Sequence, residues 1–282
     1  MFSVKSIYKY GNSDIRLSNV QQFEGTTTFT PFSAKFVIAG KEVYHSGRKK
    51  TEVTGNMYLL GNAAAESSIT IDSYIPVKGI CIDLAPELID EVAGYHFNHN
   101  VNSFTLKGKE AYTKYNAAGT NLGIAFSRLQ PLLNHTATKT EELFYMLAEC
   151  MLKDRMDIYT RINRLDAVKE ETRLRLYSFI NDARNYIDSH FLEDITLHTL
   201  AGEANISSYH FIRLFKKTFG LSPYQYILKK RLSFADELLK GGSSVTDTAY
   251  LSGFADIASF SKAYKKQYGL APTFRFKQIS NF

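Results

Sequence analysis

The C-terminal part of the chain contains an internal repeat, in which residues 206–223 resemble residues 255–272 at an offset of 49 positions. Nine of the ten pairs compared keep the same chemical type, which chance composition does not explain. A repeat of this size is one supersecondary unit used twice, so two copies of one small motif are predicted. The pairs are His210 with Ser259, Phe211 with Phe260, Arg213 with Lys262, Phe215 with Tyr264, Lys216 with Lys265, Lys217 with Lys266, Phe219 with Tyr268, Gly220 with Gly269, Leu221 with Leu270 and Pro223 with Pro272.

Each copy is predicted to be a short helix, a turn of three or four residues and a longer helix that ends at a glycine. This arrangement is a helix-turn-helix. Capping hydroxyls mark where the helices begin, and glycines mark where they end. A first helix is indicated by the apolar stripe Leu176, Phe179, Ile180, Ala183 and Ile187. Thr196 then begins a short helix, and Ser207 and Gly220 mark the start and end of the next. Ser222 with Pro223 begins a long helix that runs to about Lys240, and Ser244 begins another short one.

The longer helix of the first copy has two distinct faces. One carries aromatic and leucine residues at core spacing, and the other lies roughly 200° away, because each residue turns about 100°. A helix that reads bases in the major groove needs small or polar residues for close approach and a long cation that reaches guanine. The alternative is a solvated basic face. The second face carries Tyr209, Ile212, Arg213 and Lys216, and in the repeat Ala258, Ser261, Lys262 and Lys265.

The charge of the chain is concentrated in the same segment. The 282 residues carry a formal net charge of +6, and the sequence pI is about 9.0. Residues 1–172 hold 19 Lys and Arg against 19 Asp and Glu, whereas residues 173–282 hold 15 against nine. A basic segment beside a neutral one suggests that the first meets a polyanion while the second has another task.

Residues 180–275 resemble the DNA-binding domain of the AraC/XylS family of bacterial transcription regulators. The resemblance is carried by ITLHTLAGEANISSYHFIRLFKKTFGLSPYQYI, by VTDTAYLSGF, and by Phe260, Lys262, Tyr264, Lys265, Lys266, Gly269 and Pro272. It implies recognition helices at Ser208–Phe219 and Ile257–Tyr268, joined by a linking helix at Pro223–Lys240. In that family the recognition helices enter successive major-groove turns on one face of the DNA.

The same resemblance assigns the residues that contact DNA. Where the family has Arg and Phe, this chain has Lys262 and Tyr264, so we expect Arg213 and the first unit to supply more of the sequence discrimination. The last helix also departs from the family, since Ala271 replaces a serine and the pair Phe274-Arg275 comes one residue early. The residues expected to contact bases are Tyr209, Ile212, Arg213, Ala258, Ser259 and Lys262. The further residues expected to contact the DNA are Ser208, Lys216, Lys217, Lys265 and Lys266.

The strand pattern of the N-terminal half predicts a small antiparallel sandwich or barrel, and the family resemblance implies that it is a cupin-like barrel with added helices. The whole chain is therefore expected to be an α+β multidomain protein. Short apolar segments bounded by Gly, Asn and Ser indicate the strands. The expected domains are 1–135 for effector binding, 136–172 as a helical connector, and 173–282 for DNA binding. The stripe Leu143, Leu147 and Met151 fits either core packing or a dimer interface, and the charges of 153–164 are expected on exposed faces or in a connector.

Composition and motifs argue against other classes of protein. Cys81 and Cys150 are too few for a disulfide framework, and no signal peptide or membrane-spanning run is evident, so a cytoplasmic protein is expected. His45 stands alone among the predicted strands, and no nucleophile or phosphate-loop motif occurs, so we expect no catalysis, metal or cofactor.

The leading hypothesis is a sequence-specific transcription regulator, by resemblance an activator that works with RNA polymerase. A small-molecule effector and a homodimer are further possibilities that the family implies. The alternatives are a metal-dependent cupin-type enzyme with a helical tail, and an architectural protein that binds DNA without base preference.

Overall fold

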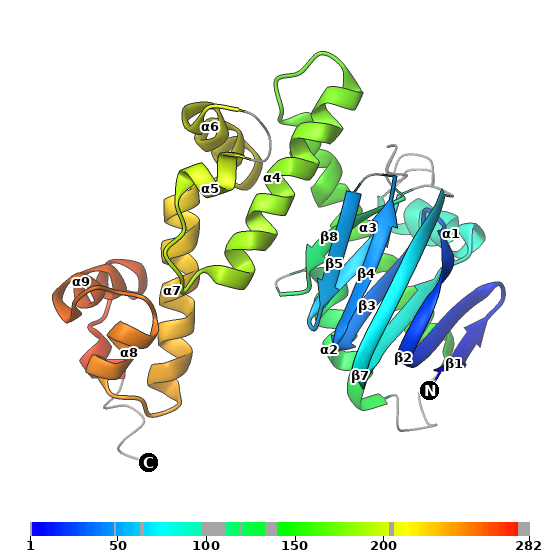
Figure 1. Ribbon diagram of the computed structural model, residues 1–282, viewed down its shortest axis with the longest axis horizontal. Helices are drawn as coiled ribbons and strands as arrows, with labels where there is room; N and C mark the ends of the chain where they lie inside the picture. The colour runs from blue at the N-terminus through cyan, green and yellow to red at the C-terminus, as the bar shows by residue number, and fades with distance from the viewer. Residues whose placement is uncertain are drawn as a thin grey trace. The chain divides into compact units, whose positions relative to one another are not determined.

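The computed structural model divides into two compact units, Met1–Ser178 and Phe179–Phe282 (Figure 1). Within the part of the chain that the structure describes, no helix is long and apolar enough to span a bilayer. The structure describes residues 2–47, 49–62, 65–97, 111–118, 120–132, 140–202 and 206–275.

The first unit is built on an antiparallel sheet, which confirms this part of the predicted fold class. Its strands are ordered β1-β2-β7-β3-β6-β8, and β4 pairs with both β5 and β7. The strands are β1 (Phe2–Tyr10), β2 (Ser13–Phe29), β3 (Ser33–Ala39), β4 (Lys41–Ser46), β5 (Lys49–Thr54), β6 (Met57–Gly61), β7 (Ala65–Asp83) and β8 (Tyr112–Asn116).

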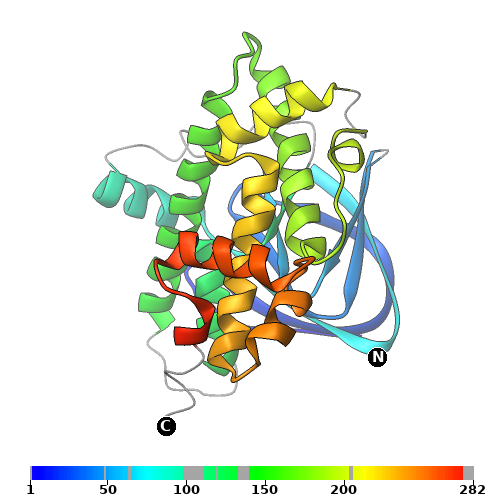
Figure 2. The ribbon, with the colours of Figure 1, turned by 90° about the vertical axis from the view of Figure 1, so that its left-hand side faces the viewer.

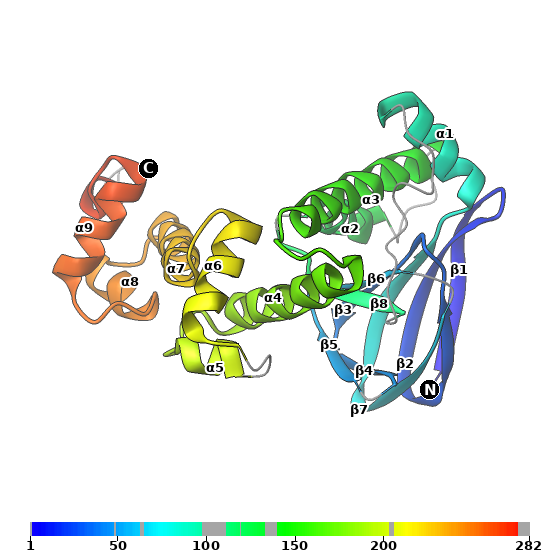
Figure 3. The ribbon, with the colours of Figure 1, turned by 90° about the horizontal axis from the view of Figure 1, so that it is seen from above.

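The sheet is not a closed barrel, because the described pairings do not join β1 to β8. The prediction of uniformly short strands is also wrong. Ser68–Ile71 and most of Lys78–Leu84 belong to one strand of 19 residues, β7, which pairs with β2 along almost its whole length. The C-terminal part of β7 also pairs with β3, and its N-terminal part pairs with β4. β7 therefore has β2 on one side and β3 and β4 in turn on the other, and the sheet curves over on itself (Figure 3).

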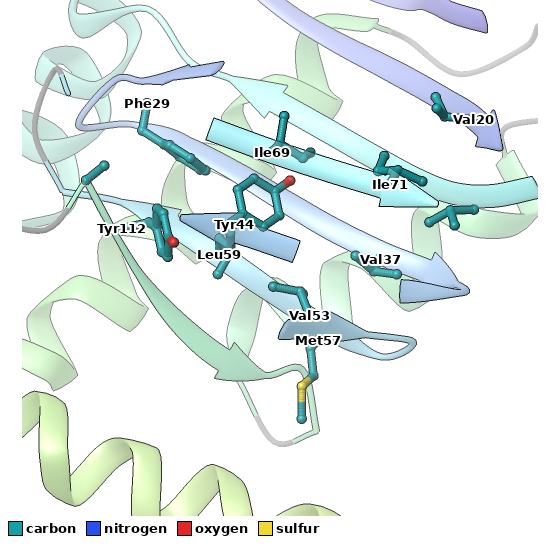
Figure 4. Packing of buried hydrophobic residues seen from close by; sticks show 12 residues of the cluster. Val20, Phe29, Val37, Tyr44, Val53, Met57, Leu59, Ile69, Ile71 and Tyr112 are labelled. Atoms are coloured by element: carbon teal, nitrogen blue, oxygen red, sulfur yellow. The ribbon is translucent and has the colours of Figure 1, made fainter. Parts of the chain in front are cut away.

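Aromatic and aliphatic side chains fill the space inside the folded sheet. Phe29, Tyr44 and Tyr112 come from three different strands, and their ring centroids lie 5.1–5.9 Å apart (Figure 4). Val53 and Leu59 are fully buried in the same cluster. This core holds the two layers together, since tightly packed aromatic groups bury large apolar areas.

The other face of the sheet is covered by helices α2 and α3 (Figure 3). Phe36 of β3 stacks on Phe126 of α2 with centroids 4.5 Å apart. Leu143, Leu147 and Met151 of α3 are at most 3% exposed. Of the two alternatives that the sequence left open for this stripe, the burial supports core packing within the first unit. The helices are α1 (Pro86–Phe97), α2 (Asn121–Leu132) and α3 (Thr140–Asn163).

Two charges of α3 correct the expectation that residues 153–164 lie on exposed faces. Asp154 is 7% exposed and Arg155 is fully buried. Asp154 accepts hydrogen bonds from the backbone N–H groups of Asn121 and Leu122, both at 2.9 Å, and so caps the N-terminus of α2. Arg155 donates to the carbonyl oxygen atoms of Pro31 and Gly61. Both charges are buried because each satisfies backbone groups of neighbouring elements.

The second unit is helical, as predicted, and α7 connects its two halves (Figure 2). The predicted limits of α6, α7 and α9 are confirmed. Phe211 and Phe215 of α6 contact Phe179 and Tyr226, whereas Phe260 and Tyr264 of α9 pack with leucines of α7. The helices are α4 (Glu170–His190), which begins in the first unit, α5 (Leu197–Gly202), α6 (Ser208–Phe219), α7 (Pro223–Lys240), α8 (Val245–Leu251) and α9 (Ile257–Tyr268).

Candidate nucleic-acid interface

Helices α6 and α9 begin and end in the same way, 49 residues apart. Ser207 caps α6 by accepting a hydrogen bond from the N–H of His210 at 3.2 Å, and Asp256 caps α9 through the N–H of Ser259 at 2.7 Å. Gly220 and Gly269 end the two helices with φ of 77° and 76°. Only glycine adopts this left-handed conformation without a steric penalty. The repeat in the sequence is therefore a repeat in backbone geometry.

Each of these helices buries one face and exposes the other. Phe211, Phe215, Phe260 and Tyr264 are fully buried. Of the eleven side chains predicted to contact DNA, ten are exposed and Ile212 is half-buried. The structure thus places ten of the eleven predicted residues on the exposed sides of two equivalent helices. The exposed ones are Ser208, Tyr209, Arg213, Lys216, Lys217, Ala258, Ser259, Lys262, Lys265 and Lys266.

The exposed face of α6 contains a pair that sequence spacing alone does not establish. The guanidinium carbon of Arg213 lies 5.9 Å from the centroid of the Tyr209 ring. Tyr209 is 71% exposed, although a tyrosine ring is largely apolar. Residues at i and i+4 are neighbours on a helix, so this contact follows from the helical spacing and the rotamers of the two side chains.

The exposed face of α9 begins with small side chains, Ala258 and Ser259, and the N-terminal cap of the helix is acidic. Asp256 accepts from both the N–H and the hydroxyl of Ser259, the latter at 2.8 Å. The N–H of Ser259 is the main cause that holds the pKa of Asp256 below its ordinary value. The hydroxyl of Ser259, expected to face DNA, is thus engaged in the cap as a donor and keeps only its acceptor capacity for a base.

One arginine of α7 ties the two halves of the second unit together. Arg231 donates to the carbonyl oxygen atoms of Phe191, Glu193 and Gly253 at 2.7, 2.9 and 2.7 Å. The first two carbonyls follow α4, and the third follows α8. The planar guanidinium suits this role because its five N–H groups point in fixed directions. The role of Arg231 is not evident from the sequence, since a single arginine in an amphipathic helix gives no signal of three backbone partners.

Asp236 of α7 anchors the second half of the unit. It accepts hydrogen bonds from the Tyr264 hydroxyl at 2.5 Å, Nε of Arg275 at 2.8 Å and Nζ of Lys240 at 2.7 Å. Burial alone would raise the pKa of Asp236, but these three donors outweigh it and bring the pKa to about 2. Two of the residues that depart from the family pattern, Tyr264 and the early Arg275, therefore meet at one carboxylate.

Within the described ranges, no group of three or more His, Cys, Asp or Glu side chains could hold a metal ion. His45, the isolated histidine of the predicted strands, lies on β4.

The family model and the related sequences match the same part of the chain. A family model described as a helix-turn-helix domain matches residues 200–278. The probable transcriptional regulator LumQ of Photobacterium leiognathi is 37% identical over 90 residues, which cover 32% of this chain and 36% of the relative. The HTH-type transcriptional activator RhaS of Enterobacter sp. (strain 638) is 32% identical over 94 residues, which cover 33% and 34%.

The matched segment spans about a third of the length of these curated relatives. Over nearly its whole length, the chain also aligns with the structure of ToxT from Vibrio cholerae. That alignment has 16% identity and a TM-score of 0.38, and it covers 96% of this chain and 98% of the other. The identification rests on the C-terminal matches alone. The C-terminal unit contains a helix-turn-helix domain of the AraC/XylS type.

Proposed function

We propose that this protein is a sequence-specific DNA-binding transcription regulator that inserts α6 and α9 into successive major-groove turns. The observation that carries the proposal is the equivalence of these helices, with matching caps, buried aromatic faces and exposed faces that carry cations. A major groove accepts one α-helix, and a long cation at its surface reaches guanine O6 and N7. The relatives that match this unit are named as regulators or activators of transcription.

The proposal also assigns a role to each segment of the chain. Residues 173–282 bind DNA, the sheet domain of residues 1–135 binds a small-molecule effector, and residues 136–172 connect the two. By analogy with the relative named as an activator, the protein stimulates transcription by RNA polymerase in the cytoplasm. The folded-over sheet with its aromatic core is the scaffold on which effector specificity would depend.

A binding selection on genomic fragments with the purified full-length protein, at two salt concentrations, tests the proposal. Two conserved sequence blocks about 10 base pairs apart are expected, because equivalent helices on one DNA face are separated by about one helical turn. Strong binding without an enriched motif would instead support the architectural alternative. That alternative is less favoured because an electrostatic binder does not need Tyr209 and Ile212 among its cations.

Arg213→Ala should cost about 1–3 kcal/mol of binding free energy on the selected site and relax the preference at one base position. The exposed guanidinium on α6 is the donor best suited to a guanine. Titrations on the selected site and on random DNA measure the difference. An equal loss on both would show that Arg213 contacts phosphate instead of a base.

Lys216→Ala should weaken binding to all sequences alike and reduce the slope of log affinity against log salt by about one unit. Lys216 is exposed in the last turn of α6, where a flexible cation reaches the backbone of the duplex. Affinities at several salt concentrations, on specific and random DNA, provide the slopes. A change confined to the selected site would contradict the assignment to phosphate.

A further inference from the structure

The exposed faces of α6 and α9 differ in chemistry at several equivalent positions, two of which lie one helical turn apart. Tyr209 and Arg213 occupy the positions that Ala258 and Lys262 occupy in the second copy. All four side chains are exposed, and the two helices have the same length and equivalent caps. One recognition helix therefore presents an aromatic ring and a guanidinium where the other presents a methyl group and an ammonium, so their base preferences can be compared within one chain.

The contact between Tyr209 and Arg213 restricts the guanidinium before any partner arrives. With the guanidinium carbon 5.9 Å from the ring centroid, the ring face attracts the cation. The N–H groups at the edge of the guanidinium remain able to donate in its own plane. Within the described part of the chain, no carboxylate forms an ion pair with Arg213. A planar donor that is already oriented loses less rotamer freedom when it binds.

The second unit lacks this arrangement. Lys262 has a compact ammonium group on a flexible stem, and Ala258 offers no ring for it to contact. An ammonium acts as a point charge and does not impose the bidentate geometry that distinguishes guanine from other bases. The expected result is a recognition helix that adds affinity with a weaker base preference.

We propose that Tyr209 is a positioning residue that holds Arg213 in the orientation that reads a guanine. The two copies of the repeat accordingly discriminate bases to unequal degrees. The inference rests on the proposed function, since it assigns a specificity role within that DNA-binding surface. Tyr209 acts through Arg213, so its effect disappears when Arg213 is absent.

The test compares base preferences selected from randomised DNA by the full-length protein and its variants. Arg213→Ala identifies the guanine that Arg213 reads. Tyr209→Ala is expected to lower the preference for that guanine over the other bases by about two- to fivefold, which corresponds to an exposed cation–π contact. Tyr209→Phe keeps the ring face and should retain the preference. In the Arg213→Ala background, Tyr209→Ala should change nothing further at that position.

The second copy provides a matched gain of function. The double variant Ala258→Tyr with Lys262→Arg recreates the pair on α9, and we expect it to strengthen a guanine preference in the second block. Lys262→Arg alone should do so less. Because all these positions are exposed, the variants should keep the helical content of the wild type by circular dichroism.

Three results would overturn the inference, and they can be told apart. If the wild type selects no motif, the proposed function fails and the inference fails with it. If a motif is selected but Tyr209→Ala leaves the guanine preference unchanged, the inference alone fails. An effect of Tyr209→Ala that persists without Arg213 would likewise overturn it, since Tyr209 would then contact DNA directly.

Discussion

Replacing Asp236 by alanine is expected to lower the free energy of unfolding of the C-terminal unit by about 2–4 kcal/mol. The carboxylate is the shared acceptor for Tyr264, Arg275 and Lys240, which come from α9, the segment after it and α7 itself. Without it, the largely buried Tyr264 hydroxyl loses its acceptor and Arg275 loses its ion pair. Because Tyr264 lies on the buried face of α9, the loss should also weaken DNA binding by the second unit.

The pH dependence of stability gives an independent view of the same cluster. The pKa of Asp236 is about 2 in the folded protein, against an ordinary value of 3.8. The folded state therefore gains stability from ionised Asp236 above about pH 4. This contribution, on the order of 2 kcal/mol, is lost as the pH falls from about 4 towards 2. Asp236→Asn should remove that part of the acid dependence.

Hydrogen exchange of α7 and α9 peptides in the full-length protein measures both effects. The matched control is Glu237→Gln, which removes an exposed carboxylate from the next position of α7. This control should exchange like the wild type at neutral pH. If Asp236→Ala and Glu237→Gln gave the same protection, the hydrogen bonds of Asp236 would not be stabilising the unit.

The second unit shows what local sequence signals can establish. The limits of α6 and α7 follow from hydroxyl caps, an initial proline and terminal glycines, all of which act within one helical turn, whereas those of α9 were implied by the family resemblance. The exposed face of α6 follows from helical periodicity alone. Local rules and the tertiary fold agree in this unit, and such agreement makes a sequence predictable.

The contacts that the sequence did not reveal join residues far apart in the chain. Asp154 caps a helix that begins at Asn121, and Arg231 donates to carbonyls 22 to 40 residues away. A charged residue in an amphipathic helix ordinarily indicates solvent exposure. Its neighbours along the chain do not show that it forms hydrogen bonds with the backbone of a distant segment. The continuous strand β7 was missed for a similar reason, since its pairing with β2 depends on a segment about 50 residues earlier.

Arg155→Ala is expected to produce the largest loss of stability, about 3–5 kcal/mol in the N-terminal unit. The guanidinium is fully buried, its carbon lies 5.3 Å from the Phe32 ring centroid, and it donates to the carbonyls of Pro31 and Gly61. Burial lowers the pKa of Arg155 to about 10, so the group stays charged at neutral pH. Truncation would leave a cavity and deprive both carbonyls of their donor.

Thermal unfolding of the full-length protein by circular dichroism, with hydrogen exchange of the α3 and β6 peptides, measures this loss. Arg155→Lys is the informative control, because it keeps the charge but cannot direct two N–H groups at two carbonyls from a planar fork. It should lie between the wild type and Arg155→Ala. Arg161→Ala, which removes an ion pair with Asp157 on the exposed side of α3, should cost under about 1 kcal/mol. Equal losses for Arg155→Ala and Arg161→Ala would contradict the structural role of the buried guanidinium, because Arg155 donates to the carbonyls of Pro31 and Gly61 whereas the ion pair of Arg161 with Asp157 lies within α3.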